Sequence, residues 1–150
     1  EPSEIGAAFG LVQFNKLKKN LRVRNKNFND LSKFFKKYEK YFILPKQLSG
    51  SKTGWLAYPI TIKKGSPFTR TEMQIFLEKR NIQTRVVFTG NILRQPGFKN
   101  IKARKIKNGY PESDKVMKNG ILLGCHQGMT KKMFHHLTTS IDLFILSKTK

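Results

Sequence analysis

The chain of 150 residues is 38% hydrophobic and contains 12 Phe, which is enough apolar material for one folded domain with a core. It carries 30 Lys and Arg against 9 Asp and Glu, a formal net charge of +21, so the expected partners are anionic: nucleic acid, a membrane surface or a phosphate-bearing ligand. The single cysteine, Cys125, excludes a disulfide-rich secreted fold, and no apolar run approaches the ~18 residues of a membrane span, which together favour a cytoplasmic protein.

Residues 5–42 are predicted to form one long helix, because no Pro or Gly interrupts residues 11–44. Apolar residues recur there at steps of three and four: Ile5, Phe9, Val12, Leu17, Leu21, Phe28, Leu31, Phe35, Tyr38 and Phe42. At about 1.5 Å per residue the helix would be roughly 55 Å long, more than a domain of this size needs. We therefore expect residues 1–44 to link this domain to another part of the protein.

A linker at residues 45–54, rich in Gly, Ser and Lys, precedes a predicted strand at residues 55–62. Alternate residues from Leu56 to Ile62 share one apolar face of that strand. Pro59 cannot donate a backbone hydrogen bond, so it places the strand at a sheet edge or at a bulge.

The rest of the chain alternates short helices and strands. Thr69 and Glu72 form a capping-box pattern that opens a helix, and the final helix is expected to bury Met133, Leu137 and Phe144. In chain order the predicted segments are a helix at 69–81, a strand at 82–88, a loop at 97–110, a helix at 111–118, a strand at 121–126 and a last helix capped by Thr130. Residues 45–150 are thus predicted to form a small α/β (α+β) domain, with a three-stranded antiparallel sheet and helices on one side.

The segment 84–98 is the strongest candidate for a binding site. Its apolar start runs into a turn at Gly90, and Asn91, Arg94 and Gln95 follow within five positions. These side chains offer donors suited to a polar, anionic ligand. An ordinary solvated turn is the alternative reading of the same composition.

His126 follows the last predicted strand and is a second candidate, as a proton donor or a ligand contact. Neighbouring residues of a strand point to opposite faces, so Cys125 and His126 would not share a metal, and zinc is not expected. A packed or half-exposed histidine is the structural alternative.

The chain shows no catalytic triad, no pair of carboxylates and no phosphate loop. The basic face of the first helix could follow a phosphate backbone, but a solvated helix face is the favoured interpretation, since no nucleic-acid-reading motif accompanies it. The chain is therefore either a binding domain or part of an enzyme.

Residues 1–17 resemble the T-E-x-x-A-A-x-G-x-x-Q-L-x-K-L helix that begins the C-terminal part of the DegT/DnrJ/EryC1/StrS nucleotide-sugar aminotransferases. Gln13, Lys16 and Leu17 match that pattern, and Phe14 departs from its usual Leu.

Further along, residues 69–85 are similar to that family's helix and G-I-x-T-R strand. Residues 88–98 resemble the F-x-G-N-x-x-R-Q-P-x-F signature of its sugar 3-dehydratase branch, and residues 114–117 and 120–130 resemble the closing segment of the same branch. The resemblance covers nearly the whole chain.

This resemblance implies the C-terminal domain of a fold type I, pyridoxal-phosphate-dependent transferase, docked on a large domain that precedes it, in a homodimer. It implies a role in deoxysugar and lipopolysaccharide biosynthesis as an NDP-4-keto-6-deoxyhexose 3-dehydratase. Pyridoxal or pyridoxamine 5'-phosphate would be held by the full-length enzyme and not by this part, so the chain alone is expected to be inactive. The substrate would be a nucleotide sugar.

Carried over position by position, the substrate-binding candidates are Arg85, Asn91, Arg94, Gln95 and His126. Each would contact the sugar nucleotide or hold the loop that does. No catalytic, cofactor-binding or metal-binding residue is expected in this chain. The family's Schiff-base lysine, replaced by histidine in the dehydratase branch, would precede residue 1, so a sugar aminotransferase stays an alternative, as does a standalone basic nucleic-acid-binding module.

Overall fold

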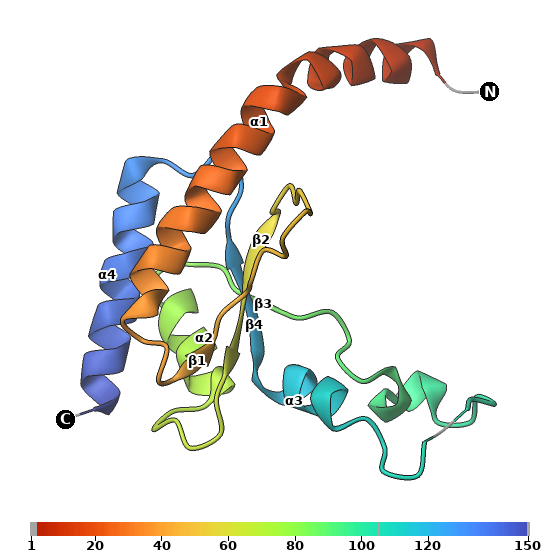
Figure 1. Cartoon of the computed structure of the whole chain (residues 1–150), viewed down its shortest axis with the longest axis vertical. Helices are drawn as coiled ribbons and strands as arrows, with labels where there is room; N and C mark the ends of the chain where they lie inside the picture. Colours follow the sequence, from red (N-terminus) through yellow and green to blue (C-terminus); the bar gives the residue numbers. More distant parts are fainter. Residues whose placement is uncertain (1–2, 105, 150) are drawn as a thin grey trace.

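The computed structural model describes residues 3–104 and 106–149, which form one long helix followed by a small sheet with helices packed on it (Figure 1). In chain order the elements are α1 (Glu4–Lys36), β1 (Phe42–Ile43), β2 (Ala57–Ile62), α2 (Arg70–Glu78), β3 (Arg85–Val86), the 3₁₀ helices η1 (Ile92–Arg94) and η2 (Pro96–Phe98), α3 (Pro111–Asn119), β4 (Gly120–Gly124) and α4 (Lys131–Lys148).

The described sheet has four strands in the order β1-β2-β4-β3, and every neighbouring pair is antiparallel. The predicted antiparallel arrangement is confirmed, whereas the predicted number of three strands is wrong. In the central pair Tyr58 lies opposite Leu123, and at the outer pair Arg85 lies opposite Leu122. Pro59 lies where β4 alone pairs β2, since β1 reaches only Thr61 and Ile62, which is consistent with the edge or bulge expected for a proline.

The additional strand comes from residues that were predicted to be helical. α1 ends at Lys36 rather than at Phe42, and a turn in which the Tyr38 N–H donates to the Phe35 carbonyl oxygen follows it. Phe42 then pairs with Ile62 in the sheet and packs edge-on against Phe35, with ring centroids 5.5 Å apart. The helical spacing continued to Phe42 because its side chain is indeed buried, but a strand buries it as well as a helix would.

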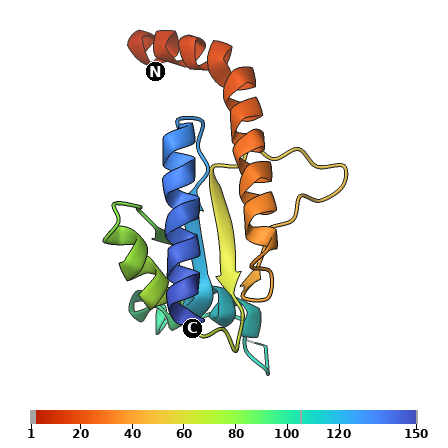
Figure 2. The same cartoon turned by 90° about the vertical axis from the view of Figure 1, so that its left-hand side faces the viewer.

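The core lies between one face of the sheet and two helices, α1 and α4, that run along it (Figures 1 and 2). The sheet contributes buried residues such as Ile60 and Leu123, and α4 contributes Leu137 and Phe144. Met133, predicted to be on the buried side of the last helix, is 47% exposed. The predicted placement of helices on one side holds for α1, α2 and α4, while α3 lies beside the end of the sheet (Figure 1).

The C-terminal half of α1 belongs to this core, although the sequence assigned residues 1–44 to a linking segment. Leu31 and Phe35 are fully buried, and Phe28 stacks on Trp55 with ring centroids 4.0 Å apart. The N-terminal half instead projects beyond the domain (Figures 1 and 2). It exposes large apolar side chains on several sides of the helix: Ile5, Phe9, Leu11, Val12, Phe14 and Leu17.

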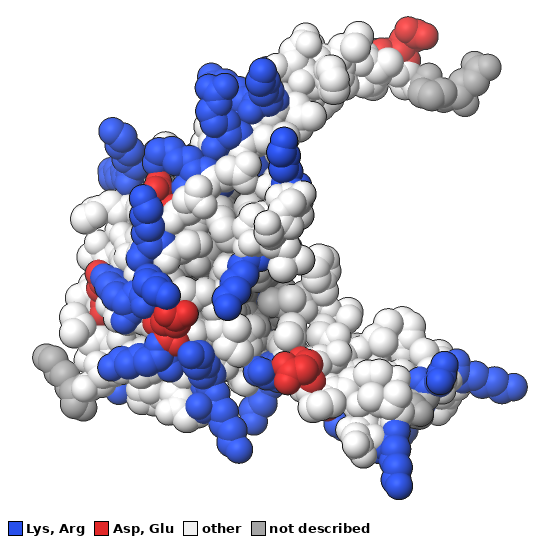
Figure 3. Space-filling view, in the orientation of Figure 1, with Lys and Arg blue, Asp and Glu red and all other residues white. Residues whose placement is uncertain are grey.

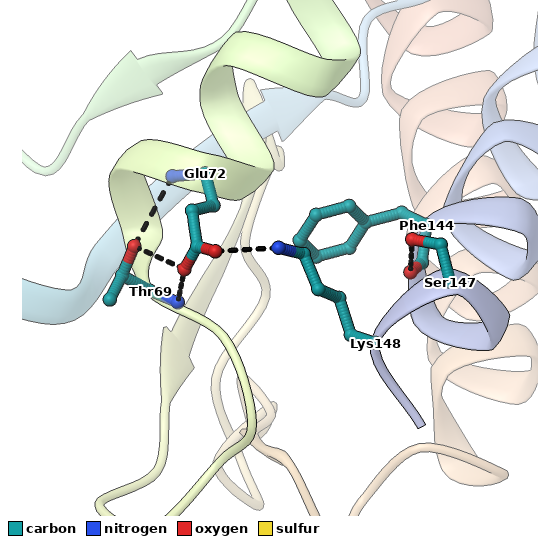
Figure 4. Close-up of polar contacts among 5 residues, drawn as sticks. All are labelled: Thr69, Glu72, Phe144, Ser147 and Lys148. Carbon is teal, nitrogen blue, oxygen red and sulfur yellow. Dashed lines mark hydrogen bonds and ion pairs between the residues drawn. The ribbon is translucent and has the colours of Figure 1, made fainter. Parts of the chain in front are cut away.

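The capping box predicted for the second helix is present and also fastens α2 to α4 (Figure 4). Thr69 Oγ1 accepts from the Glu72 N–H, and the Glu72 carboxylate accepts from the Thr69 N–H at 2.7 Å. The other oxygen of that carboxylate accepts from Lys148 Nζ at 2.6 Å. The Lys148 and Thr69 bonds hold the pKa of Glu72 at about 2, below its ordinary value.

None of the helices in the described part of the chain combines the length and the apolar character needed to span a membrane.

Candidate functional site

The loop at residues 87–98, which belongs to the candidate binding segment, begins with a tight turn from Val87 to Gly90, directly after β3. The Gly90 N–H donates to the Val87 carbonyl oxygen at 3.2 Å, and Gly90 has a φ of +64°. A β-carbon on Gly90 would lie 2.2 Å from Met117 Cβ, so only glycine allows the turn to approach α3 this closely. The sequence reading of Gly90 as a turn residue is thus explained by both conformation and packing.

Asn91, Arg94 and Asp114 then form one cluster that fixes the loop to the first turn of α3. Asn91 is buried; its Oδ1 accepts from the Leu93 N–H at 3.1 Å and so caps η1, and its Nδ2 donates to Asp114 Oδ1 at 2.7 Å. Arg94 reaches both oxygens of the same carboxylate, at 3.1 Å and 2.9 Å. Hydrogen bonds from Arg94 and then from Asn91 lower the pKa of Asp114, so it remains ionised.

Gln95 closes the loop on itself, because its Nε2 donates to the Thr89 carbonyl oxygen at 2.9 Å. Asn91, Arg94 and Gln95 therefore make the contacts of residues that hold a loop in shape. The Arg94 side chain stays 65% exposed, and together with Asn91, Lys107 and Tyr110 it borders a shallow depression of about 290 Å³.

Arg85 lies on β3 and is exposed, and among the described residues its guanidinium meets no hydrogen-bond partner. It sits at the base of the loop, two residues before the Val87–Gly90 turn. Its N–H donors are therefore available to a ligand, whereas two nitrogens of Arg94 already donate to Asp114.

His126 lies elsewhere, beyond the end of β4. Since Arg85 is opposite Leu122 in the sheet, His126 lies four residues further along the chain, two residues past the end of β4 and away from the loop. Its Nδ1 accepts from the Gly128 N–H at 3.1 Å, so the neutral ring carries its proton on Nε2. It borders a depression of about 340 Å³ with Gln83, Met129 and His136. The structure thus brings Asn91, Arg94 and Gln95 together and leaves His126 apart from them.

The loop and the N-terminal half of α1 leave the domain on the same side, the side away from α4 (Figure 1). The space-filling view shows an open hollow between these two arms, while Lys and Arg side chains gather over α1 (Figure 3). Local sequence patterns do not predict this shape, because it depends on how the two arms diverge from the sheet. Asp114 was also missed as the partner of the loop, although it stands among the acidic residues that open α3.

A pyridoxal phosphate site typically pairs the pyridine nitrogen with a carboxylate beside the residue that reacts at the cofactor's carbon. The acidic groups nearest the loop and α2 are already engaged, Asp114 with Arg94 and Asn91, and Glu72 with Thr69 and Lys148. These carboxylates therefore do not fit the role of partner to the cofactor's pyridine nitrogen.

Comparison with known proteins identifies the relatives of this chain. Residues 3–142 match the model of the DegT/DnrJ/EryC1/StrS aminotransferase family. The chain is 29% identical over 142 residues to the lipopolysaccharide biosynthesis protein RfbH of Salmonella typhimurium, covering 95% of this chain and 32% of the relative. It is 32% identical over 143 residues to dTDP-4-dehydro-2,6-dideoxy-D-glucose 3-dehydratase of Saccharopolyspora spinosa, covering 95% and 30%. The chain therefore spans about a third of the length of these relatives.

Solved structures share the fold. GDP-4-keto-6-deoxy-D-mannose-3-dehydratase of Escherichia coli, solved with bound hydrated PLP, superposes with a TM-score of 0.78 at 25% identity, over 93% of this chain and 35% of that one. An aminotransferase from Psychrobacter cryohalolentis superposes over all of this chain and 40% of that one, with a TM-score of 0.87 at 12% identity, which shows the fold alone. The predicted fold class is confirmed.

Proposed function

The chain belongs to the DegT/DnrJ/EryC1/StrS aminotransferase family, and from this we propose that it is the C-terminal part of a pyridoxal- or pyridoxamine-phosphate-dependent NDP-4-keto-6-deoxyhexose 3-dehydratase. The observation that carries the proposal is its 32% identity to a named sugar 3-dehydratase over 95% of its residues. The loop that resembles the dehydratase signature supports it, since its Asn and Arg form one fixed cluster with Asp114. The rest of the enzyme would hold the cofactor, which supplies the electron sink for removal of the C3 hydroxyl.

In this proposal the residues of the loop have two roles. Asn91 and Asp114 hold the loop against α3, and Gln95 closes the loop on itself. Arg85 donates charge-assisted hydrogen bonds to the pyrophosphate of the nucleotide sugar. Arg94 serves both roles, because it binds Asp114 while most of its side chain stays exposed. Prior fixing of the loop lowers the entropy that a ligand would otherwise have to remove on binding.

His126 is proposed to offer its Nε2–H to the substrate from the other end of β4. The hydrogen bond from Gly128 to Nδ1 supports this role, because it selects the ring tautomer that donates through Nε2. A substrate that meets both His126 and Arg85 would lie along β4, so the two groups would contact different parts of one extended nucleotide sugar.

The proposal includes the remaining two thirds of the enzyme as a partner. The exposed apolar side chains of the N-terminal half of α1 suit packing against it, because large apolar groups such as Ile5, 82% exposed, and Phe14, 71% exposed, are unfavourable in water. We also propose that the complete enzyme is a homodimer and that it is located in the cytoplasm. The buried, unpaired Cys125 is compatible with a reducing compartment.

The test uses the complete enzyme, a nucleotide 4-keto-6-deoxyhexose and mass spectrometry of the product. Loss of the C3 hydroxyl supports the dehydratase, whereas replacement of the keto oxygen by an amino group identifies the aminotransferase alternative. Arg85→Ala should raise KM about tenfold, because it removes charge-assisted bonds to the ligand. Lys99→Ala, an exposed lysine beyond η2, is the matched control and should leave KM unchanged.

Binding of random DNA or RNA that is tight, falls steeply with salt and is unaffected by Arg85→Ala would favour the nucleic-acid-binding alternative. An enzyme that neither dehydrates nor aminates such a sugar would contradict the proposal.

A further inference from the structure

Phe88 combines two features that folding alone does not explain. Its φ is +47°, in the left-handed region where residues with a β-carbon are strained and bulky ones are genuine outliers. Its side chain is 86% exposed, the highest value among the large hydrophobic residues described. A strained backbone and an exposed aromatic ring both disfavour the folded chain. Residues with such strain cluster at binding and active sites, which points to a functional role for Phe88.

The residues on both sides of Phe88 impose its conformation. Phe88 is the second residue of the Val87–Gly90 turn, a position that glycine or asparagine usually takes when φ is positive. Gly90 is pressed against Met117, and Val87 approaches Gly120 so closely that a β-carbon there would lie 2.8 Å from Val87 Cγ2. The Thr89 carbonyl oxygen is held by Gln95. With its neighbours fixed in this way, the backbone at Phe88 is held in the left-handed region and its ring is left in solvent.

We propose that Phe88 contacts the hexose of the nucleotide sugar, with its ring packed against the C–H groups and the methyl group of a 6-deoxyhexose. This inference rests on the proposed function. Phe88 follows Arg85 by three residues and precedes Asn91 by three, so the chain carries an exposed apolar ring between polar residues proposed to bind the ligand, and apolar groups with a few polar ones are typical of ligand sites.

The choice of the hexose over the nucleobase follows from the relatives. The two named dehydratases act on sugars carried by different nucleotides, dTDP in one and GDP in the other, and both sugars are 6-deoxy and carry a keto group at C4. An aromatic contact with the shared part of these substrates suits a segment that resembles the signature of the branch as a whole. The C6 methyl group is the apolar feature that distinguishes these sugars from ordinary hexoses.

The experiment compares Phe88→Ala and Phe88→Gly in the complete enzyme. Both variants should raise KM for the nucleotide 4-keto-6-deoxyhexose about tenfold, the effect of losing an apolar contact in a binding site. The inhibition constant of the free nucleoside diphosphate, which lacks the hexose, should stay unchanged. Phe88→Gly should also have a higher Tm than Phe88→Ala, because glycine adopts a positive φ without strain.

Ile101→Ala is the matched control, since Ile101 is an exposed apolar residue further along the same arm, 43% accessible to solvent. It should leave KM and the inhibition constant as in the wild type. If the wild type binds a nucleotide sugar and both Phe88 variants bind it equally well, the inference is wrong while the proposed function stands.

Two further outcomes would also overturn the inference. An inhibition constant that rises as much as KM would place the ring on the nucleobase. A lower Tm in both variants with an unchanged KM would show that the Phe88 ring packs against other residues of the enzyme instead of the sugar. A wild type that binds no nucleotide sugar would refute the proposed function and, with it, this inference.

Discussion

Gly90→Ala tests whether the loop is fixed to α3 by close packing of the backbone. The added β-carbon would lie 2.2 Å from Met117 Cβ and 2.5 Å from Met117 Cα. A residue with a β-carbon at the φ of +64° costs about 1–2 kcal/mol, and overpacking against a fixed neighbour costs about 1–3 kcal/mol more. We therefore expect the free energy of unfolding to fall by about 2–5 kcal/mol.

The assay is urea unfolding followed by circular dichroism, together with hydrogen exchange of residues 88–98. Gly97→Ala is the control, because nothing lies within 4 Å of a β-carbon at that position and its φ is not positive. It should change the free energy of unfolding by less than about 0.5 kcal/mol.

A second substitution sharpens this test. Met117→Ala should not rescue Gly90→Ala, since the clashing Cα and Cβ atoms of residue 117 are still present in alanine. If Gly90→Ala and Gly97→Ala unfold at the same urea concentration and exchange equally fast, the loop is not docked on α3 and the reasoning fails.

Two further predictions concern the rest of the domain. Because the pKa of Glu72 is lowered from 4.5 to about 2, chiefly by Lys148 and then by Thr69, its contribution to stability is complete above pH 4.5 and is lost as the pH falls toward 2. Glu72→Gln should lower Tm at pH 7 and flatten its dependence on pH across that window; parallel curves for the two proteins would contradict this. Phe35→Ala, at a fully buried ring stacked on the sheet, should lower the free energy of unfolding by about 3–5 kcal/mol in urea titrations. In this chain by itself, Phe14→Ala, at a 71% exposed ring, should change the free energy of unfolding by less than about 0.5 kcal/mol, and equal effects of the two substitutions would disprove the assigned core.

The parts of the fold that sequence reasoning found are those with local signals. The capping box at Thr69 depends on residues three apart, so it can be read directly from the sequence. The short strand at Phe42 could not be read in this way, because its side chain satisfied a helical spacing and only pairing with Ile62 decides its conformation.

Local signals likewise located the turn of the candidate site but not the residue that holds it. The turn at Gly90 and its polar residues are contiguous in the sequence, whereas Asp114, which fixes them, lies 23 residues beyond Asn91. A side-chain hydrogen bond at that separation has no local pattern. The distance of His126 from the loop follows from the register of β3 on β4, which is set by packing and not by composition.

The outer strands of the described sheet also bear on how this chain would aggregate. β1 and β3 are two residues long each, so they offer too few backbone groups for another sheet to join. The longer β2 carries Pro59 where β1 does not cover it, which removes a donor from the remaining edge. If copies of this chain cluster at high concentration, we expect helix-to-helix contacts without the β-sheet growth and dye binding that mark amyloid fibrils.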